Sequence, residues 1–124
     1  MRKLIFVLTL FIAITLPTLS FSQSVAQVTT VEVPGAKTAE YVAAVKALAP
    51  VIKKHSPSAT VRVWQATVAG AASNRISVVV EFPSLAAWAE GTPKLVADPA
   101  YQSALRKFEG MGRKIVSVSM ASEL

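Results

Sequence analysis

The chain has 124 residues, no cysteine and a formal net charge of +6 at pH 7. The length supports one domain with a modest core, and the missing cysteine excludes disulfides, thiol catalysis and thiolate metal sites. The basic residues occur as adjacent pairs rather than as a stripe interleaved with aromatic residues, so we expect a solvated basic surface and no nucleic-acid partner. The pairs are Lys53-Lys54, Arg106-Lys107 and Arg113-Lys114.

The first 22 residues have the layout of a secretory signal peptide. A positively charged pair precedes an apolar run over residues 4–16, and Ser20 and Ser22 are small residues at the positions that a signal peptidase reads. The run is shorter than the roughly 20 residues that a bilayer needs, although an uncleaved anchor reaching Phe21 is the alternative. Cleavage after Ser22 would leave one exported domain over residues 23–124, periplasmic or secreted, without a membrane partner. A lipoprotein anchor is excluded because it needs a cysteine.

The first half of this domain has a strand pattern followed by a helix pattern. Residues 25–33 are rich in Val and Thr and alternate loosely, which predicts a strand. Apolar residues at helical spacing then predict a helix that Thr38 caps and that ends with the basic turn at residues 53–55. Pro50 falls inside the helix pattern, so we expect it to kink the helix or to end its first part near Ala49.

In the second half of the domain, strand patterns again alternate with helix patterns along the chain. Gly91-Thr92-Pro93 interrupts a helical pattern, and Asp98-Pro99 restarts it, because an acidic N-cap followed by proline favours a helix start. Gly110 ends this last helix. We therefore expect strands over 60–69, 75–82 and 114–121, a hairpin loop over 70–74, and helices over 85–90 and 99–110.

One short motif occurs twice in this order. Val31-Glu32-Val33-Pro34 recurs as Val80-Glu81-Phe82-Pro83, and each copy ends a strand and precedes a helix. The element order is therefore a β-α-β unit and its repeat. With short, right-handed connections this predicts an α+β fold, a ferredoxin-like βαββαβ sandwich with a four-stranded antiparallel sheet and the helices on one face.

Alternation along the strands leaves one face of this sheet uncovered. Glu32, Glu81 and Trp64 are expected on that face, with Arg62 directly opposite Glu81 and Trp64 opposite Val79. Such a face is too apolar to remain in water, so we expect a second copy of the chain to cover it, sheet to sheet. The expected homodimer interface residues are Trp64, Arg62, Val79, Glu81 and Val118, with Val68, Val116 and Met120 beside them.

Two segments resemble a known superfamily. Residues 78–88, which read Val-Val-Val-Glu-Phe-Pro-Ser-Leu-Ala-Ala-Trp, and Asp98-Pro99-Ala100-Tyr101 are similar to the second half of the dimeric α/β-barrel superfamily. The nearest similarity is to its antibiotic-biosynthesis-monooxygenase-like and NIPSNAP-like members. The resemblance implies a dimer that forms an α/β barrel. It implies no single activity, because the superfamily includes cofactor-free oxygenases, haem-degrading enzymes, isomerases and dehydratases.

The resemblance also implies a ligand cleft between the helices and the sheet. Aromatic residues of the helical segments and of the third strand would line it, although aromatics at helical spacing more often pack as core. The expected pocket residues are Tyr41, Phe82, Trp88, Tyr101 and Phe108.

Three titratable residues are the catalytic candidates, and each has a structural alternative. His55, the only histidine, is a candidate base, but its basic neighbours indicate an exposed helix end. Glu32 and Glu81 would lie at one edge of the sheet if the first and third strands are adjacent and parallel. Two close carboxylates separate their pKa values, as acid–base chemistry requires. The alternative is an ion-pair cluster with Arg62 at the dimer interface.

No cofactor or metal is expected. Haem-degrading members of the superfamily use an Asn on the first strand, and a Trp and an iron-ligating His on the second helix. Trp88 is a counterpart of the Trp, but Thr29 and Thr30 stand where the Asn would be sought, and no His follows Trp88. One His and scattered acids do not make a metal site.

These observations predict an exported dimer that binds a small apolar or aromatic molecule in a helix–sheet cleft. Two alternatives remain open at this point, a cofactor-independent monooxygenase or isomerase of the antibiotic-biosynthesis-monooxygenase type, and a structural dimer without a ligand. A structural dimer predicts a filled core, whereas an enzyme predicts a buried polar group that converges on a cavity.

Overall fold

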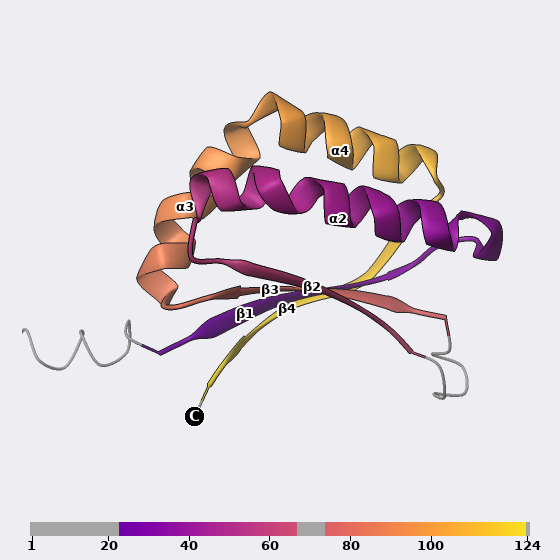
Figure 1. Ribbon diagram of the computed structural model, residues 1–124. Coiled ribbons are helices and arrows are strands. Elements are labelled where there is room, and N and C mark those ends of the chain that lie inside the picture. The colour runs from indigo at the N-terminus through magenta and orange to yellow at the C-terminus, as the bar shows by residue number, and fades with distance from the viewer. Residues whose placement is uncertain (1–22, 67–73, 124) are drawn as a thin grey trace, which may run out of the picture.

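The computed structural model describes residues 23–66 and 74–123 (Figure 1). The expected signal peptide and Val68 lie outside these residues. Within them, no helix is both long and apolar enough to cross a membrane. The elements in chain order are β1 (Val25–Glu32), a 3-10 turn η1 (Gly35–Lys37), α2 (Thr38–His55), β2 (Thr60–Gln65), β3 (Ile76–Phe82), α3 (Leu85–Ala97), α4 (Pro99–Gly110) and β4 (Lys114–Ser122).

The four strands form one antiparallel sheet in the order β2-β3-β1-β4. The helices lie on one face of this sheet, and none of the described helices lies on the other face (Figure 1). The expected α+β, ferredoxin-like architecture is therefore confirmed.

Two helices continue where the sequence predicts a break. Helix α2 runs from Thr38 to His55 through Pro50, and α3 runs from Leu85 to Ala97 through Gly91 and Pro93. A proline inside a helix costs about 3 kcal/mol, but each buried apolar side chain contributes about 1.5–3 kcal/mol. In α2 the buried stripe continues on both sides of the proline, so packing outweighs the local penalty. The stripe consists of Tyr41, Val45, Leu48 and Ile52.

The start of α4 follows the prediction closely. Asp98 is the N-cap, and its Oδ1 accepts a hydrogen bond of 2.8 Å from the Ala100 amide, with Pro99 in the first helical position. Ser84 caps α3 in the same way, since its Oγ accepts a 3.0 Å hydrogen bond from the Ala87 amide. Both caps satisfy an amide that the helix leaves without a partner.

The register between β2 and β3 differs from the prediction by two residues. Arg62 lies opposite Val79, and Trp64 lies opposite Ser77. A shift of two keeps every side chain on its expected face, so Arg62 and Trp64 do lie on the uncovered side. Arg62 still reaches Glu81 diagonally, with 3.4 Å between Nη1 and Oε1.

The face assigned to β4 is wrong. Val118 lies opposite Thr29 and Met120 opposite Gln27, which turns both towards the helix side of the sheet. The register shifts between Thr30 and Val31, where β4 contains an extra residue. Alternation within β4 cannot reveal which of its two sides meets the helices, and the bulge removes the remaining clue. Val118 therefore does not belong to the uncovered face.

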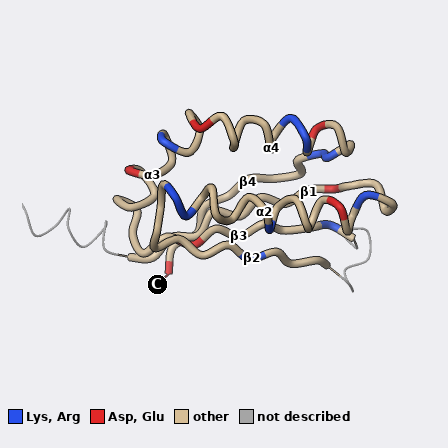
Figure 2. The backbone as a smooth tube through the Cα atoms, turned by 45° about the horizontal axis from the view of Figure 1, so that its top comes forward, with Lys and Arg blue, Asp and Glu red and all other residues tan. Residues whose placement is uncertain are grey.

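The core lies between the helices and the sheet. Its most buried large side chains are Tyr41 of α2, Val31 of β1 and Ile76 of β3. Each strand contains a single charged residue, and the helices and loops carry most of the others (Figure 2). The side of the sheet that faces the helices is consequently free of charged strand residues in its central part, which suits an apolar layer.

Candidate functional site

A cavity of about 180 Å³ lies between the helices and the sheet. Its apolar wall includes Val45 and Leu48 of α2, Val78 and Val80 of β3, and Leu105 of α4. For comparison, a dry cavity of about 150 Å³ in another protein holds benzene. This cavity is therefore large enough for a molecule of one ring.

Four of the five aromatic residues expected around a pocket line this cavity. Tyr41, Phe82, Tyr101 and Phe108 are among its lining residues. The rings of Tyr41 and Phe108 contact each other edge to face, with 5.1 Å between their centroids and 62° between their planes. The structure thus brings these four residues to one space.

Trp88 takes a different place. It is not among the described residues that line the cavity, and its indole Nε1 donates a 3.0 Å hydrogen bond to Oε1 of Gln27. Because the indole nitrogen only donates, the Gln27 atom facing it must be the oxygen. This contact fixes the Gln27 amide, which itself lines the cavity. Trp88 thus positions the Gln27 side chain in the cavity wall without lining the cavity itself.

Arg113 is a cavity residue that the sequence analysis assigned to the solvated surface. It follows the end of α4, where Gly112 has a φ of +82°. The Gly112 amide donates to the Glu109 carbonyl at 3.0 Å, and the Arg113 amide donates to the Phe108 carbonyl at 3.3 Å. These two bonds form a Schellman motif, which reverses the chain after a helix. The reversal brings the Arg113 side chain back along α4.

The guanidinium of Arg113 lies against the aromatic wall of the cavity. Its Cζ is 5.2 Å from the centroid of the Phe108 ring, a cation–π distance. The Nε atom is buried, and no residue in the described ranges accepts a hydrogen bond from it. The salt bridges found among these residues also leave Arg113 out. A cation with an unpartnered buried donor is therefore placed at an apolar cavity.

Tyr41 is the second titratable group in this wall. Burial raises the pKa of its hydroxyl above the usual value of 10.0, and the Arg113 side chain opposes part of this rise through hydrogen bonding and charge. The hydroxyl therefore stays protonated at neutral pH. It can donate a hydrogen bond, but it is not a base.

The two glutamates do not form a pair. Strands β1 and β3 are adjacent but antiparallel, with Val31 opposite Ile76 and Ala26 opposite Glu81. Glu32 and Glu81 therefore lie at opposite ends of the sheet, and the arrangement that would separate their pKa values is absent. Glu32 accepts a 3.1 Å hydrogen bond from Nε of Arg75. Glu81 pairs with Arg62, as the ion-pair alternative expects.

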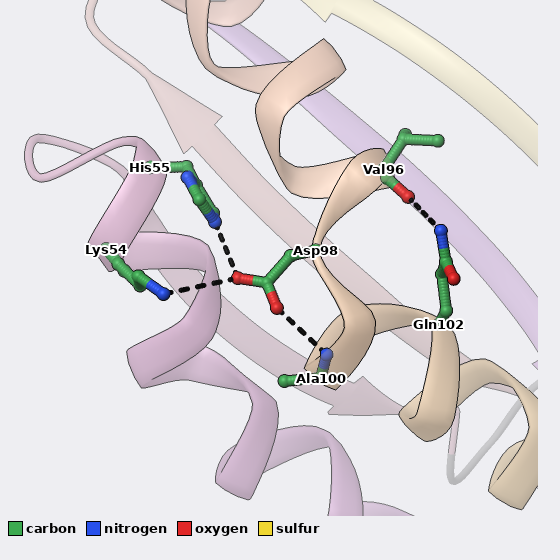
Figure 3. A network of polar contacts seen from close by, with 6 residues as sticks. All are labelled: Lys54, His55, Val96, Asp98, Ala100 and Gln102. Carbon is green, nitrogen blue, oxygen red and sulfur yellow. Dashed lines mark hydrogen bonds and ion pairs between the residues drawn. The ribbon is translucent and has the colours of Figure 1, made fainter.

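His55 lies in a polar cluster away from the cavity (Figure 3). Its Nε2 is 2.7 Å from Oδ2 of Asp98, and only 18% of its side chain is exposed. Lys54 approaches the same oxygen at 3.6 Å. The hydrogen bond from His55 is the main cause that holds the pKa of Asp98 below 3.8, and the Ala100 amide adds to it. The cluster links the end of α2 to the start of α4, which is a structural role.

The cavity wall combines a large apolar surface with a few polar groups. Among its described lining residues there is no carboxylate, imidazole or lysine, so an ordinary general base is missing there. The described part of the chain also contains no group of three His, Asp or Glu side chains that could hold a metal ion. What the wall offers is an apolar surface, a cation and several neutral donors. The polar lining residues are Gln27, Thr29, Tyr41, Thr92, Tyr101 and Arg113.

Comparisons with known proteins agree with this architecture. No family model matches the chain, and no curated protein matches it significantly. Among solved structures, a NIPSNAP family protein of unknown function from Agrobacterium tumefaciens is 19% identical, with a TM-score of 0.61 over 82% of this chain and 87% of that one. An antibiotic-biosynthesis-monooxygenase-like protein from Caulobacter crescentus is 15% identical, with a TM-score of 0.62 over 86% and 95% of the two chains. The chain shares the fold of these proteins.

A third structure extends the comparison. A NIPSNAP domain protein from Burkholderia xenovorans is 14% identical, with a TM-score of 0.60 over 81% of this chain and 92% of that one. The resemblance inferred from residues 78–88 and 98–101 is thus confirmed at the level of fold. At these identities the likeness carries no activity over to this chain.

Proposed function

We propose that this protein binds a small apolar or aromatic molecule, about one ring in size, in the cavity between the helices and the sheet. The observation that carries the proposal is the cavity itself, which four aromatic residues line. Protein interiors are close-packed and contain few voids larger than a water molecule. This space of about 180 Å³ is partly open to solvent, and an apolar molecule that fills it removes the apolar wall from water. The cavity also argues against the structural dimer with a filled core.

The proposal is tested by filling the cavity. Replacing Leu105 with Trp adds a large ring to a side chain that lines the space, whereas Ser103→Trp adds the same ring to the exposed side of the same helix. Native mass spectrometry of the purified protein and titration with single-ring compounds would then compare both variants with wild type. We expect Leu105→Trp to abolish binding and Ser103→Trp to retain it. Equal binding by both variants would place the site elsewhere, and no binding by wild type would refute the proposal.

A cofactor-independent monooxygenase or isomerase is the second candidate. The observation that favours it is the Arg113 cation at the cavity, because such a cation stabilises a developing enolate or phenolate oxygen. Oxygen uptake in the presence of single-ring phenols tests the monooxygenase. Uptake by wild type but not by Leu105→Trp would support it, whereas equal uptake by both would assign the reaction to solution chemistry.

We further propose that the mature protein is exported and acts as a homodimer. The charged, apolar and small-residue regions of the first 22 residues support export. N-terminal sequencing of protein recovered from outside the cytoplasm tests this, and a retained Met1 would indicate an anchor instead. The helix-free face of the sheet supports the dimer (Figure 1).

A further inference from the structure

We infer that the molecule bound in the cavity carries an anionic oxygen group, a carboxylate or phenolate, which Arg113 holds. This inference rests on the proposed function and narrows it to one chemical class, single-ring organic anions. It is drawn from the one cation in the described cavity wall and from its unused hydrogen-bonding capacity.

Arg113 contains a buried donor for which the described part of the chain supplies no acceptor. Buried polar atoms in proteins almost always have a hydrogen-bond partner. In the described residues the Nε of Arg113 has none, although this atom is buried. Guanidinium groups bind carboxylates in a fork of two parallel N–H···O bonds, and Nε is one arm of such a fork. A carboxylate or phenolate oxygen in the cavity would satisfy it.

The charges around the cavity also favour an anionic ligand, because Arg113 is the one charged residue in its described wall. No carboxylate lines the described wall, and Arg113 takes part in none of the ion pairs found among the described residues. A partly buried cation without an anion is unfavourable in an apolar surrounding. The Phe108 ring stabilises one side of the guanidinium. A bound anion would supply the missing negative charge beside the guanidinium. The rest of the ligand would then contact the apolar walls of the cavity.

The other polar groups of the wall suit an oxygen-rich ligand. The Trp88 indole occupies the carbonyl oxygen of Gln27, which leaves the amide nitrogen of Gln27 as a donor. The Tyr41 hydroxyl stays protonated because burial raises its pKa. The wall is therefore rich in donors and poor in acceptors. A neutral, purely apolar ring would use none of them.

The test uses two probes of nearly the same shape, benzoate and benzamide, with the mature chain. Binding is measured by chemical-shift changes in two-dimensional NMR spectra of the labelled protein, which also report whether each variant is folded. We expect benzoate to bind roughly tenfold or more tightly than benzamide, because a hydrogen bond to a charged group contributes about 1.5–3 kcal/mol. The resonances of Arg113 and Phe108 should shift.

Three variants test whether Arg113 causes the preference for benzoate over benzamide. Arg113→Gln should remove the preference for benzoate and leave the binding of benzamide unchanged. Arg113→Lys, which keeps the charge but loses the Nε donor, should retain part of the preference. Arg106→Gln is the matched control, since Arg106 lies on α4, seven positions before Arg113, with an exposed side chain. It removes the same charge from the surface and should change nothing.

The outcomes separate this inference from the proposal beneath it. Equal binding of the two probes, both lost in Leu105→Trp, would overturn the anion inference and leave the pocket in place. A benzoate preference that survives Arg113→Gln, or that disappears in Arg106→Gln, would also overturn it, because surface charge would then be the cause. If neither probe binds wild type, both the inference and the proposed function fail.

Discussion

At the scale of single residues, the end of α4 determines where the cavity cation lies. Arg113 reaches Phe108 because the chain reverses at Gly112, whose positive φ a residue with a side chain adopts only with strain. A Cβ at this position would also lie 3.2 Å from Cγ of Pro34. The position of a charge in the candidate site thus depends on a glycine that does not touch the cavity.

The first prediction concerns this glycine. Gly112→Ala should lower the free energy of unfolding by about 1–2 kcal/mol, the cost of placing a side chain in the left-handed region. It should also weaken any benzoate binding, because the reversal that orients Arg113 becomes strained. Urea denaturation measures the first effect, and NMR titration the second.

Gly110 provides the control for this substitution. It lies two residues earlier, at the end of α4, and a Cβ added there meets nothing within 4 Å. Gly110→Ala should therefore leave the stability unchanged or raise it slightly, since alanine favours the helix. Equal destabilisation by both substitutions would show that the φ of Gly112 is not the cause.

At the scale of the elements, the polar cluster around Asp98 holds two helices together. Its carboxylate caps α4 through Oδ1 and accepts from His55 of α2 through Oδ2 (Figure 3). The sequence revealed the first function, because Asp-Pro is a local signal. It could not reveal the second, because the contact joins residues 43 positions apart. His55, one of the three catalytic candidates, thus connects α2 to the start of α4 through this contact.

The second prediction follows from the lowered pKa of Asp98. A carboxylate whose pKa is lower in the folded state than in the unfolded state binds fewer protons when folded, so its contribution to stability is complete above the unfolded pKa. That contribution is lost as the pH falls below 3.8 and through the lowered pKa of the folded protein. Wild type should therefore lose stability in this range more steeply than Asp98→Asn.

The Asn variant isolates the charge from the cap. Asparagine caps helices about as well as aspartate does, so Asp98→Asn removes the ionised partner of His55 and Lys54 while it keeps the bond to Ala100. Urea denaturation at a series of pH values measures the difference. Parallel pH profiles for wild type and variant would mean that Asp98 does not stabilise the fold through its charge.

The third prediction concerns the crossing of α3 over the end of α2. Gly91 is buried, and a Cβ there would collide with Oγ of Ser56 and lie 3.0 Å from the His55 carbonyl oxygen. Gly91→Ala gains up to about 1 kcal/mol of helix propensity but should lose about 1–3 kcal/mol to overpacking. We expect net destabilisation in thermal or urea unfolding.

A double variant tests the assigned cause. Ser56→Gly removes the side chain that the new Cβ would meet, but it leaves the His55 carbonyl in place. The double variant Gly91→Ala with Ser56→Gly should therefore be destabilised relative to Ser56→Gly alone by less than Gly91→Ala is relative to wild type. If the two losses are the same, the clash with Ser56 is not what limits this position.

Local sequence signals predicted most helices and strands, whereas contacts between distant segments determine which residues line the cavity. The Asp98 cap and the helix-facing sides of β1 and β3 followed from patterns within each segment, and the fold class followed from the order of the elements. Helix α2 does not end near Ala49, because tertiary burial outweighs the local penalty of Pro50. The sequence missed Gln27 and Arg113, since their surroundings come from distant elements. For Arg113 the one local clue was the glycine before it, which marks a chain reversal.

At the scale of the whole molecule, the uncovered face of the sheet is less apolar than the sequence suggested. Strand β4 turns Ser117 and Ser119 towards it, in place of Val118 and Met120. On this face, Thr30 and Ser77 also join β1 to β3 through a hydrogen bond of 3.1 Å between their hydroxyl groups. Trp64 remains the large apolar side chain on this face, with 61% of its surface exposed. A dimer across this face would therefore depend strongly on Trp64.

The fourth prediction tests that dimer. Light scattering on the mature chain should give the mass of a dimer, and Trp64→Lys should raise its dissociation constant by roughly 30-fold or more, because a buried aromatic anchor contributes about 2 kcal/mol or more. Val118→Lys is the matched control, since Val118 is similarly exposed, at 57%, but lies on the helix side. A dimer weakened by Val118→Lys and unaffected by Trp64→Lys would place the interface on β4 and the helix side. A monomeric wild type would refute the sheet-to-sheet dimer.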